Sequence, residues 1–491
     1  MKKSQIVSLL RIILTGVFIL LINRIIVAQE ENLNVFERWR AWSDGGNMLM
    51  HHLNKQAFTY LDTRDNEIAG LETKADWTNR QKRVKDILMK TVGPFPEKTP
   101  LNPQVTGTIK KEGYKIEKIV YESMPGFYVT GCLYLPDGSE KKPAILFVSG
   151  HTANGFRHTS YQVMILNLVK KGFIVFAIDP ISQGERVQHY DPEKNASLIG
   201  PGSPTREHSH LGNQTFLSGI SVARYFIWDG IRAIDYLLTR KEVDPGRLGV
   251  TGQSGGGTQS SYIFAFDERI KAGAPVNYIT GFRRLLESIG PQDAEQNLFR
   301  GIMNGLTHAD FLEVRAPNPV LISAGTRDFF SIQGARETYA EVSKAYKAFG
   351  MEENISLVED DFGHGYTVKL NEAIYDFFQK SLDNPGSPKN EDIAILSPEE
   401  LKVTPTGNVA SSYENAETVF SINKKETQKL ISQWQASRNN LDMHLQKIRL
   451  KAKEISGYVT PEVDVKSVFR GRYQRDGYSV EMYALHGEGK C

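Results

Sequence analysis

Short apolar runs separated by amphipathic stretches dominate the pattern between residues 143 and 382. The runs, each of three to six residues, lie at 144–148, 173–178, 248–250, 272–274, 320–322 and 355–358. Such runs are typical of strands buried on both faces of a sheet. Helical patterns lie between or after them at 161–171, 221–238, 259–266, 334–349 and 371–382. This alternation predicts an α/β fold, a doubly wound and mostly parallel sheet with helices on both faces.

A different pattern precedes the sheet. Residues 32–88 are amphipathic with a helical period, and a helix is expected to end before Gly93-Pro94. Residues 114–122 and 128–135 read as strands. The Asp-, Asn-, Pro- and Gly-rich stretch after residue 382 reads as a linker. The predicted organisation is a signal peptide, an N-terminal helical segment, the α/β domain, a linker and a C-terminal module, at 1–28, 29–110, 111–383, 384–392 and 393–491.

The C-terminal module resembles the start of the α/β unit. Gly107 and Gly471 lie 364 positions apart, and Gly113 and Gly477 lie the same distance apart. Both pairs belong to basic segments that end in Gly-Tyr. A fixed offset is the sign of an internal repeat. We expect a partial second copy that either docks on the first unit or stays unpaired, because an incomplete sheet exposes its edges.

The N-terminus predicts export. Met1-Lys-Lys is followed by an apolar stretch that is too short to span a bilayer, and Ala28 offers a cleavage position. The mature chain is expected to begin near Gln29 and to be periplasmic or extracellular. Arg24 is unusual within a signal peptide and leaves an uncleaved anchor as the alternative.

Composition argues against several classes of binding partner. A formal charge of +2 over 491 residues, without a basic patch, argues against nucleic acid. Two cysteines define neither a disulfide framework nor a metal cluster. No cofactor is expected, and the oligomeric state is left open.

Gly252-Gln-Ser254-Gly-Gly256 follows an apolar run and precedes a helical pattern. This Gly-x-Ser-x-Gly order of strand, sharp turn and helix is typical of the nucleophile elbow of α/β-hydrolases. Small neighbours let the strained turn close, and the helix N-terminus directs N–H groups at developing negative charge. A serine needs a base and an orienting acid, so the motif alone does not establish a nucleophile.

Asp328 and His364 follow Ser254 in the order used by α/β-hydrolases, each just past an expected strand. The carboxyl ends of parallel strands meet at one edge of the sheet, where ligands bind. We therefore predict a catalytic triad of Ser254, Asp328 and His364. Three other carboxylates compete for the acid role but lie too close to His364 in sequence: Glu359, Asp360 and Asp361.

The oxyanion of the tetrahedral intermediate needs two donors. One is expected to be the N–H of Gly255, the residue after the nucleophile. The second should come from the loop after the run 144–148, where His151 and Thr152 are the candidates. The loss of one such donor typically costs about 2.7–4 kcal/mol of transition-state stabilisation.

Two further histidine motifs have less specific readings. His208-Ser-His210 could be half of a metal site, but without a third ligand at useful spacing we expect a loop, and no metal site is predicted. His308-Ala-Asp310 could touch substrate or cap a helix. The stretch 278–311 occupies the position of a cap over the pocket.

Several longer motifs together resemble the α/β-hydrolases identified as acetyl xylan esterases. They are Gly150-His151, Asp179-Pro-Ile-Ser-Gln-Gly-Glu-Arg186, Trp228-Asp-Gly-Ile-Arg-Ala-Ile-Asp-Tyr-Leu237, Asp244-Pro-Gly-Arg247 and Gly325-Thr-Arg-Asp-Phe-Phe330. The resemblance covers residues 77–382 and implies a secreted serine esterase that removes acetyl groups from a plant polysaccharide or another carbohydrate ester without a cofactor.

Two other functions are compatible with the same motifs. A prolyl-oligopeptidase-like peptidase usually carries a β-propeller before the hydrolase unit, and the segment 29–143 is too short for one. A degenerate hydrolase kept as a binding module should have lost a triad residue, and none is missing from the chain.

Overall fold

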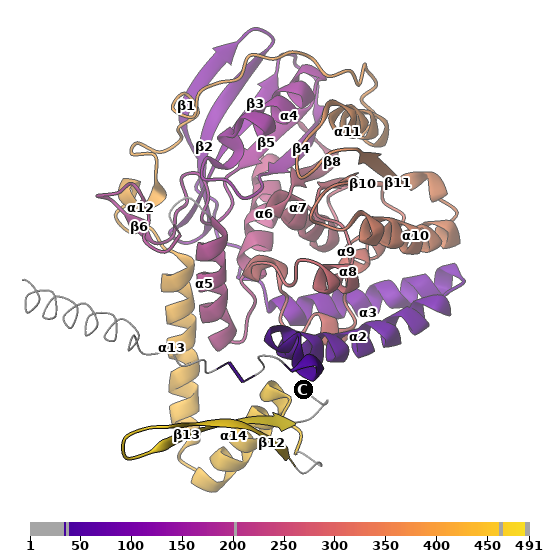
Figure 1. Cartoon of the computed structure of the whole chain (residues 1–491). Helices are drawn as coiled ribbons and strands as arrows, with labels where there is room; N and C mark the ends of the chain where they lie inside the picture. The colour runs from indigo at the N-terminus through magenta and orange to yellow at the C-terminus, as the bar shows by residue number, and fades with distance from the viewer. Residues whose placement is uncertain (1–33, 36–38, 201–203, 461–464, 487–491) are drawn as a thin grey trace, which may run out of the picture. The chain divides into compact units, whose positions relative to one another are not determined.

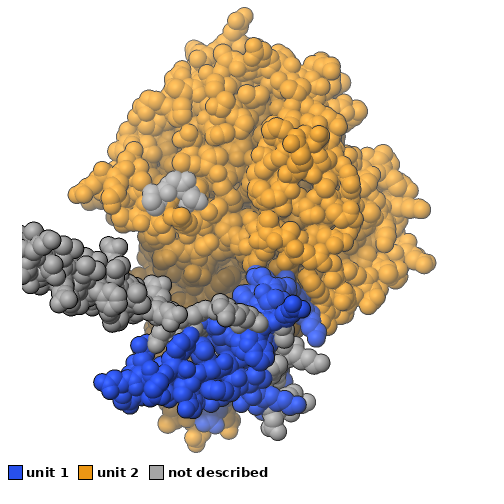
Figure 2. Space-filling view, viewed as in Figure 1, with its two compact units in different colours: residues 1–55, 447–491 blue, residues 56–446 orange. Residues whose placement is uncertain are grey.

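The computed structural model describes residues 34–35, 39–200, 204–460 and 465–486. They divide into two compact units, one made of the two ends of the chain, residues 1–55 and 447–491, and one of residues 56–446 (Figure 2). The predicted signal peptide lies outside the described residues. Within them, no helix is both long and apolar enough to cross a bilayer.

A nine-stranded sheet forms the centre of the larger unit (Figure 1), in the order β1-β2-β3-β5-β4-β8-β9-β10-β11. From β5 to β11 every neighbouring pair is parallel, and β1, β2 and β3 add antiparallel neighbours at one edge. The predicted doubly wound, mostly parallel sheet is confirmed. Its strands are β1 (Gln104–Lys111), β2 (Tyr114–Met124), β3 (Phe127–Pro136), β4 (Lys142–Val148), β5 (Ile174–Ile178), β8 (Val243–Gln253), β9 (Ala272–Val276), β10 (Val320–Gly325) and β11 (Ile355–Asp360).

Helices cover both faces of the sheet because its central strands carry apolar side chains on both sides. Along β4, Leu146 belongs to one core and Phe147 to the other. The first core takes side chains from α6 (Ala223–Leu237), α7 (Gly255–Phe266) and α10 (Ile332–Phe349). The second takes them from α4 (Thr159–Lys170) and α11 (Val368–Ser381). This arrangement places the start of α7 inside the molecule, directly behind β8.

Shorter elements surround the carboxyl edge of the sheet. The stretch of the His208 motif, expected as a loop, is the helix α5, because its apolar side chains pack inward. The remaining short elements of the larger unit are β6 (Tyr190–Asp191), β7 (Ala196–Ser197), α5 (Pro204–Leu217), α8 (Phe282–Glu287), α9 (His308–Glu313) and α12 (Val409–Ser412), with 3-10 turns at Gly155–Arg157, Ala294–Gln296, Ile302–Asn304 and Glu352–Asn354.

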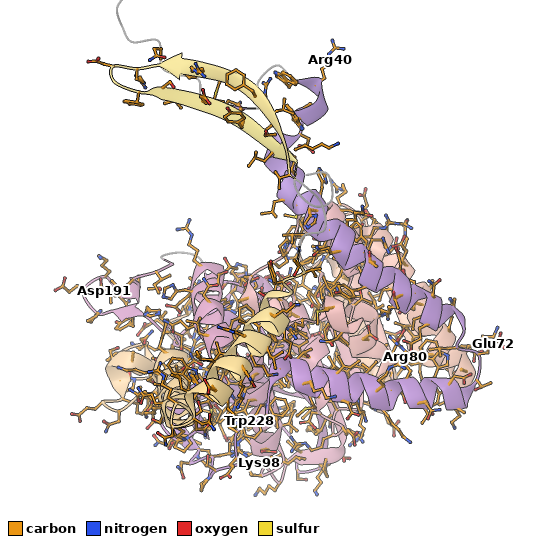
Figure 3. All side chains as sticks on the ribbon, turned by 90° about the horizontal axis from the view of Figure 1, so that it is seen from below. Arg40, Glu72, Arg80, Lys98, Asp191 and Trp228 are labelled. Carbon is orange, nitrogen blue, oxygen red and sulfur yellow. The ribbon has the colours of Figure 1, made fainter. Side chains whose placement is uncertain are left out.

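Two N-terminal helices, α2 (Met48–Ala69) and α3 (Lys74–Val92), precede the sheet; 3-10 turns at Arg40–Trp42 and Gly45–Asn47 come before them. Thr73 and Asp76 form a capping box that starts α3, and Gly93 ends it with φ of 88°. Arg64 of α2 and Arg80 of α3 are buried and both bind Asp310 of α9. Figure 3 views these helices from below, with Arg80 labelled. Charge pairing therefore fixes both helices to α9.

The chain after α11 runs over the larger unit as a strap, residues 393–419. Leu396, Leu401 and Val403 are buried in the second core. The backbone N–H groups of Val403 and Thr404 donate to the carboxylate of Glu185 at 2.6 and 2.7 Å. The strap leads into α13 (Val419–Ser437), α14 (Leu441–Ser456) and the hairpin β12 (Lys466–Gln474) and β13 (Ser479–His486).

The compact units divide the chain at other positions than the predicted domains, which remain a prediction. The larger unit includes the stretch 384–392, the strap and α13, whereas the hairpin β12–β13 belongs to the smaller one. In the smaller unit the guanidinium of Arg470 lies 3.6 Å from the ring centre of Trp39. Trp39 in turn stacks on Trp42.

Candidate active site

Ser254 occupies the turn between β8 and α7 in a strained conformation, with φ of 61° and ψ of −122°. Non-glycine residues rarely adopt positive φ, and such strain is concentrated at functional sites. The turn also leaves no space beside it: a Cβ on Gly252 or Gly256 would lie 2.2 or 2.1 Å from the carbonyl oxygen of Val148. The glycines of the motif are therefore required sterically, as expected of a nucleophile elbow.

His364 and Asp328 lie in the loops after β11 and β10 and contact each other. His364 Nδ1 is 2.9 Å from Asp328 Oδ2 and 3.0 Å from Oδ1. The carboxylate is itself held, because Asn277 Nδ2 donates to Oδ2 at 2.6 Å and the Phe330 N–H donates to Oδ1 at 3.0 Å. The Nδ1–H of His364 thus faces an acceptor, which leaves Nε2 as the proton acceptor that a general base needs.

The structure does not place Ser254 and His364 in hydrogen-bond contact. Within the described parts of the chain, no hydrogen bond joins Ser254 Oγ to the imidazole. Catalytic hydrogen bonds are often long without substrate and tighten in the substrate complex. All three predicted triad residues nevertheless follow strand ends at the carboxyl edge of the sheet, those of β8, β10 and β11.

The competing carboxylates are engaged elsewhere. Asp361 is exposed and accepts from Arg327 Nε at 2.8 Å, and Glu359 pairs with Arg336 at 2.6 Å. Asp360 accepts the Asp361 N–H at 3.0 Å. The contacts of the described residues thus leave Asp328 as the carboxylate that faces His364.

The loop after β4 packs against the nucleophile turn. A Cβ on Gly150 would lie 3.1 Å from Ser254 Cβ, and a Cβ on Gly255 would lie 2.5 Å from His151 Nε2. Among the described residues, neither the Gly255 N–H nor the His151 N–H has an acceptor. The Thr152 N–H, in contrast, donates to Gln183 Oε1 at 2.9 Å. Of these three amides, those of Gly255 and His151 have no acceptor among the described residues.

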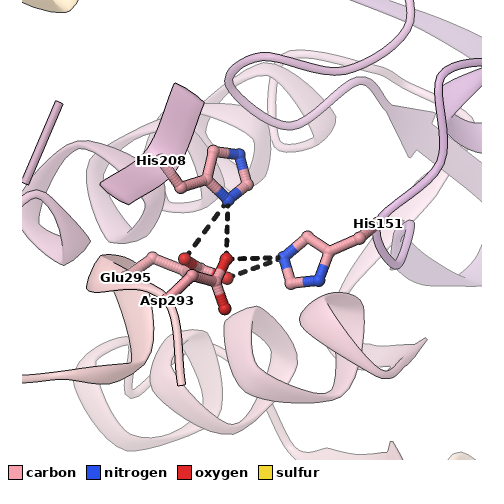
Figure 4. Close-up of side chains that lie close together, drawn as sticks. All are labelled: His151, His208, Asp293 and Glu295. Atoms are coloured by element: carbon pink, nitrogen blue, oxygen red, sulfur yellow. Dashed lines mark hydrogen bonds and ion pairs between the residues drawn. The ribbon is translucent and has the colours of Figure 1, made fainter. Parts of the chain in front are cut away.

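Beside this loop, His151, His208, Asp293 and Glu295 converge (Figure 4). His151 Nε2 lies 2.7 Å from Glu295 Oε1 and 3.4 Å from Asp293 Oδ2. His208 Nδ1 lies 3.1 Å from Asp293 Oδ2 and 3.2 Å from Glu295 Oε2. The sequence suggested His208 as a metal ligand only together with His210, and it gave no role to Asp293 or Glu295. The Asp-x-Glu spacing within the cap stretch was the available signal.

Electrostatics couple the four groups. Burial alone would lower the pKa of His208, but the charge of Glu295 and the hydrogen bond to Asp293 raise it well above its ordinary value. Burial would raise the pKa of Glu295, but the two imidazoles hold it well below its usual range. Burial and the neighbouring Glu295 raise the pKa of Asp293. The charges of the four side chains therefore depend on one another.

The other two motif histidines have structural contacts. His308 is fully buried, accepts the Thr280 N–H at Nδ1 at 3.0 Å, and its pKa is lowered by burial to about 3. Asp310 pairs with the arginines of α2 and α3 and belongs to the capping box of α9. The ring of His210 contacts His189 and Phe420. These contacts favour the helix-capping reading of the His308 motif.

A cleft of about 640 Å³ opens beside the histidine–carboxylate cluster. Residues of α5 and of the cap stretch line it, including Arg206, His210 and Asp293. One of the cluster carboxylates thus also borders a space large enough for a sugar residue, because ligand pockets typically measure about 300–1,000 Å³.

Known proteins are similar to parts of this chain. Residues 92–310 match the model of the family described as acetyl xylan esterase (AXE1). A curated relative, the putative hydrolase YtaP of Bacillus subtilis (strain 168), is 23% identical over 316 residues, which cover 60% of this chain and 97% of that protein.

Two solved structures are similar to the fold. The methylesterase BT1017 superposes with a TM-score of 0.58 and 20% identity, over 78% of this chain and 81% of its own. A putative acetyl xylan esterase from Bacteroides fragilis NCTC 9343 superposes with a TM-score of 0.47 and 18% identity, over 58% of this chain and 76% of its own.

Proposed function

We propose that this chain, which is a carboxylic ester hydrolase with an α/β-hydrolase domain of the acetyl xylan esterase type, removes acetyl groups from xylan or a related carbohydrate through Ser254, His364 and Asp328. The observation that carries the proposal is the strained Ser254 at the β8–α7 turn, on the same sheet edge as the Asp328–His364 pair. The family match supports the acetyl group and the carbohydrate.

The chemistry follows from the geometry. Ser254 Oγ attacks the acyl carbon while His364 Nε2 takes its proton, and Asp328 stabilises the imidazolium through Nδ1–H. The oxyanion accepts from the N–H groups of Gly255 and His151, next to the positive end of α7. The intermediate then collapses: the bond from the acyl carbon to the sugar oxygen breaks, and the imidazolium gives its proton to that oxygen, which leaves as the sugar hydroxyl. Water attacks the acyl-enzyme with the same histidine as base and releases acetate.

The two alternatives have less support. The described residues before β1 form helices, and none of them forms a strand that a β-propeller blade would need. A binding module that has lost catalysis does not need a buried carboxylate aligned on a histidine, and Asp328 accepts two further hydrogen bonds that hold it there. Export with a mature N-terminus near Gln29 is part of the proposal, since the substrate is extracellular.

The test is hydrolysis of a chromogenic acetyl ester, followed by release of acetate from acetylated xylan. Ser254→Ala should lower kcat by several orders of magnitude with little effect on folding. Asp328→Asn should lower it by about 10⁴-fold, by analogy with the effect of the wrong histidine tautomer in serine proteases.

Asp361→Asn is the matched control, because that carboxylate is close to His364 in sequence but pairs with Arg327. It should retain nearly full activity. Equal losses in both aspartate variants, or activity that survives Ser254→Ala, would contradict the proposed triad. A parallel assay uses methyl esters of uronic acids, in which the sugar is the acyl part of the ester. In acetylated xylan the sugar is the alcohol part, so the two assays show which side of the ester the enzyme requires to be a sugar.

A further inference from the structure

Most of the buried carboxylates among the described residues are paired with arginine. Asp310 and Glu313 are paired with Arg80, and Arg157 pairs with Asp179. Asp293 and Glu295 are also buried, but the ion pairs of the described residues give them only His151 and His208 as partners. Taking two carboxylates out of water is costly unless cations compensate them. These two neighbouring carboxylates therefore lack the arginine that compensates most of the others, and a different cation can take its place.

We propose that His151, His208, Asp293 and Glu295 bind one divalent transition-metal ion, with Zn²⁺ as the best match. One ligand atom from each side chain lies within 4.8 Å of all the others. Tetrahedral zinc has ligands at about 2.0–2.2 Å, which places them about 3.4 Å from one another. The four carboxylate–imidazole separations, 2.7 to 3.4 Å, need only small adjustments to reach that spacing.

The orientation of His208 is that of a metal ligand. Its Nε2 lies 2.9 Å from the carbonyl oxygen of Ile181, which can only accept, so Nε2 carries a hydrogen. The lone pair of the neutral ring is then on Nδ1, aimed at the two carboxylates. Metal-binding histidines typically donate their other N–H to a carbonyl or carboxylate in this way.

Glu295 supplies an independent indication. Its side chain is almost fully buried, and Oε2 accepts no hydrogen bond from any described residue. Buried polar atoms are nearly always satisfied by hydrogen bonds, water or an ion. An ion at the centre of the four ligand atoms satisfies Oε2 and replaces the protons that the imidazoles would otherwise need for charge balance.

The ligand types select the metal. Two imidazole nitrogens with two carboxylates suit zinc and other first-row divalent ions, whereas calcium and magnesium prefer sites made entirely of oxygen atoms. The ligands come from the loop after β4, from α5 and from the cap stretch. The ion would therefore join three segments that are distant in sequence.

The ion would also position His151, which packs against the turn that carries Ser254. The ring of His151 packs over Gly255, the residue after Ser254. Ligation through Nε2 would fix this ring and with it the backbone N–H of His151, which faces no protein acceptor. The site thus has a positioning role for the oxyanion loop, and its existence does not depend on the proposed esterase chemistry.

Direct binding to the full chain tests the proposal. Chelator-treated protein is titrated with Zn²⁺ by calorimetry in two buffers of different ionisation enthalpy. We expect one ion per chain and proton release that grows as the pH is lowered, because ligands must lose their protons to bind metal. Thermal unfolding provides a second readout, since a ligand of the folded state raises Tm.

Glu295→Gln and His208→Asn should each weaken binding by more than about 100-fold, since the loss of an outer hydrogen-bond partner alone costs about 10–100-fold. His210→Asn is the matched control, because it belongs to the same His-x-His motif but contacts His189 and Phe420. It should bind as the parent does, and so should Ser254→Ala, which separates this proposal from the triad.

Should Glu295→Gln fail to fold, Asp293→Asn replaces it, because Asp293 borders the open cleft. The proposal is wrong if the parent binds no ion more tightly than these variants do. It is equally wrong if His210→Asn loses as much affinity as His208→Asn, since surface histidines would then account for the binding.

Discussion

Two regions of the chain have the same local structure but different surroundings. In β1–β2, Gly107 pairs with Lys118 after an irregular step that follows Val105. In β12–β13, Gly471 pairs with Met482 after the same irregular step. All corresponding positions lie 364 residues apart, and α2 and α3 precede the first hairpin as α13 and α14 precede the second. The two hairpins therefore share their register and bulge at the same offset, and a second copy of the unit stays a prediction.

Burial separates the two copies. The strand β2 is buried along most of its length, whereas β12 is mostly exposed. The helix α3 buries six side chains, and α14 buries only His444. Position by position, Trp77 corresponds to Leu441 and Arg80 to His444. The turn glycines are shared, but the side chains that dock the helices are not, so hairpin geometry and tertiary packing depend on different residues.

The largest expected difference between the two copies is in the free energy of unfolding lost when Arg80 or its counterpart His444 is replaced. Arg80→Met leaves Asp310 and Glu313 buried with less compensation, and breaking such a pair costs about 3–5 kcal/mol. His444→Ala removes a contact with Ser437 and should cost about 1 kcal/mol. Urea unfolding monitored by circular dichroism measures both. Equal losses would mean that the second copy is docked as firmly as the first.

A core substitution gives the next contrast. Trp77 is 1% exposed, and Trp77→Ala should destabilise the larger unit by about 3–5 kcal/mol. Leu441 is 59% exposed, and Leu441→Ala should change stability by less than about 0.5 kcal/mol. Thermal unfolding compares the two. A large effect at Leu441 would show that α14 buries this face against something in solution.

Lowering the pH should destabilise the fold around α9, the helix to which α2 and α3 of the first copy are bound. His308 of α9 is neutral in the fold, with its pKa lowered to about 3 by burial. The unfolded chain binds this proton near pH 6.5, so stability is intact above that pH and falls towards pH 3 by about 1.4 kcal/mol per pH unit.

The slope can be assigned with His308→Asn, whose amide oxygen can still accept the Thr280 N–H. This variant should lose less stability between pH 6.5 and 5 than the parent does. Identical slopes for both proteins would exclude His308 as the origin of the acid sensitivity.

The smallest expected loss of stability comes from alanine at the hairpin turns, and it should be equal in the two copies. Gly113 and Gly477 have φ of 84° and 81°, and a Cβ would meet nothing within 4 Å at either position. Alanine at either turn should therefore cost only the backbone strain of about 1–2 kcal/mol. Amide hydrogen exchange of the adjoining strands provides the measurement. Unequal costs would show that one turn is not held at positive φ.

The sequence predicted the sheet and the order of the candidate triad because both depend on local signals. Buried runs mark the parallel strands, and the glycines around Ser254 are dictated by the turn itself. The sequence located the oxyanion loop but could not decide between His151 and Thr152. The Thr152 N–H donates to Gln183, and this tertiary contact leaves no signal in the sequence.

The histidine–carboxylate cluster could not be predicted for a related reason. Its four residues come from three segments with no fixed spacing, and only the fold brings them together. Arg64 and Arg80 appeared to be ordinary residues of amphipathic helices, because their partners on α9 and α10 lie more than 200 positions away. Ion pairs between residues far apart in the sequence produce no periodic pattern along the chain.

The strap has a practical consequence for shortening the protein. Deletion from residue 384 onward would take Leu396, Leu401 and Val403 out of the second core and would strip Glu185 of both backbone donors. Residues up to Glu426 still bond to the larger unit: Asn423 contacts Gln214 and Ser218, and Glu426 accepts from Arg224 at 3.2 Å. A minimal enzyme should therefore retain the first two turns of α13, and removal of the repeat without damage to the hydrolase should begin beyond them.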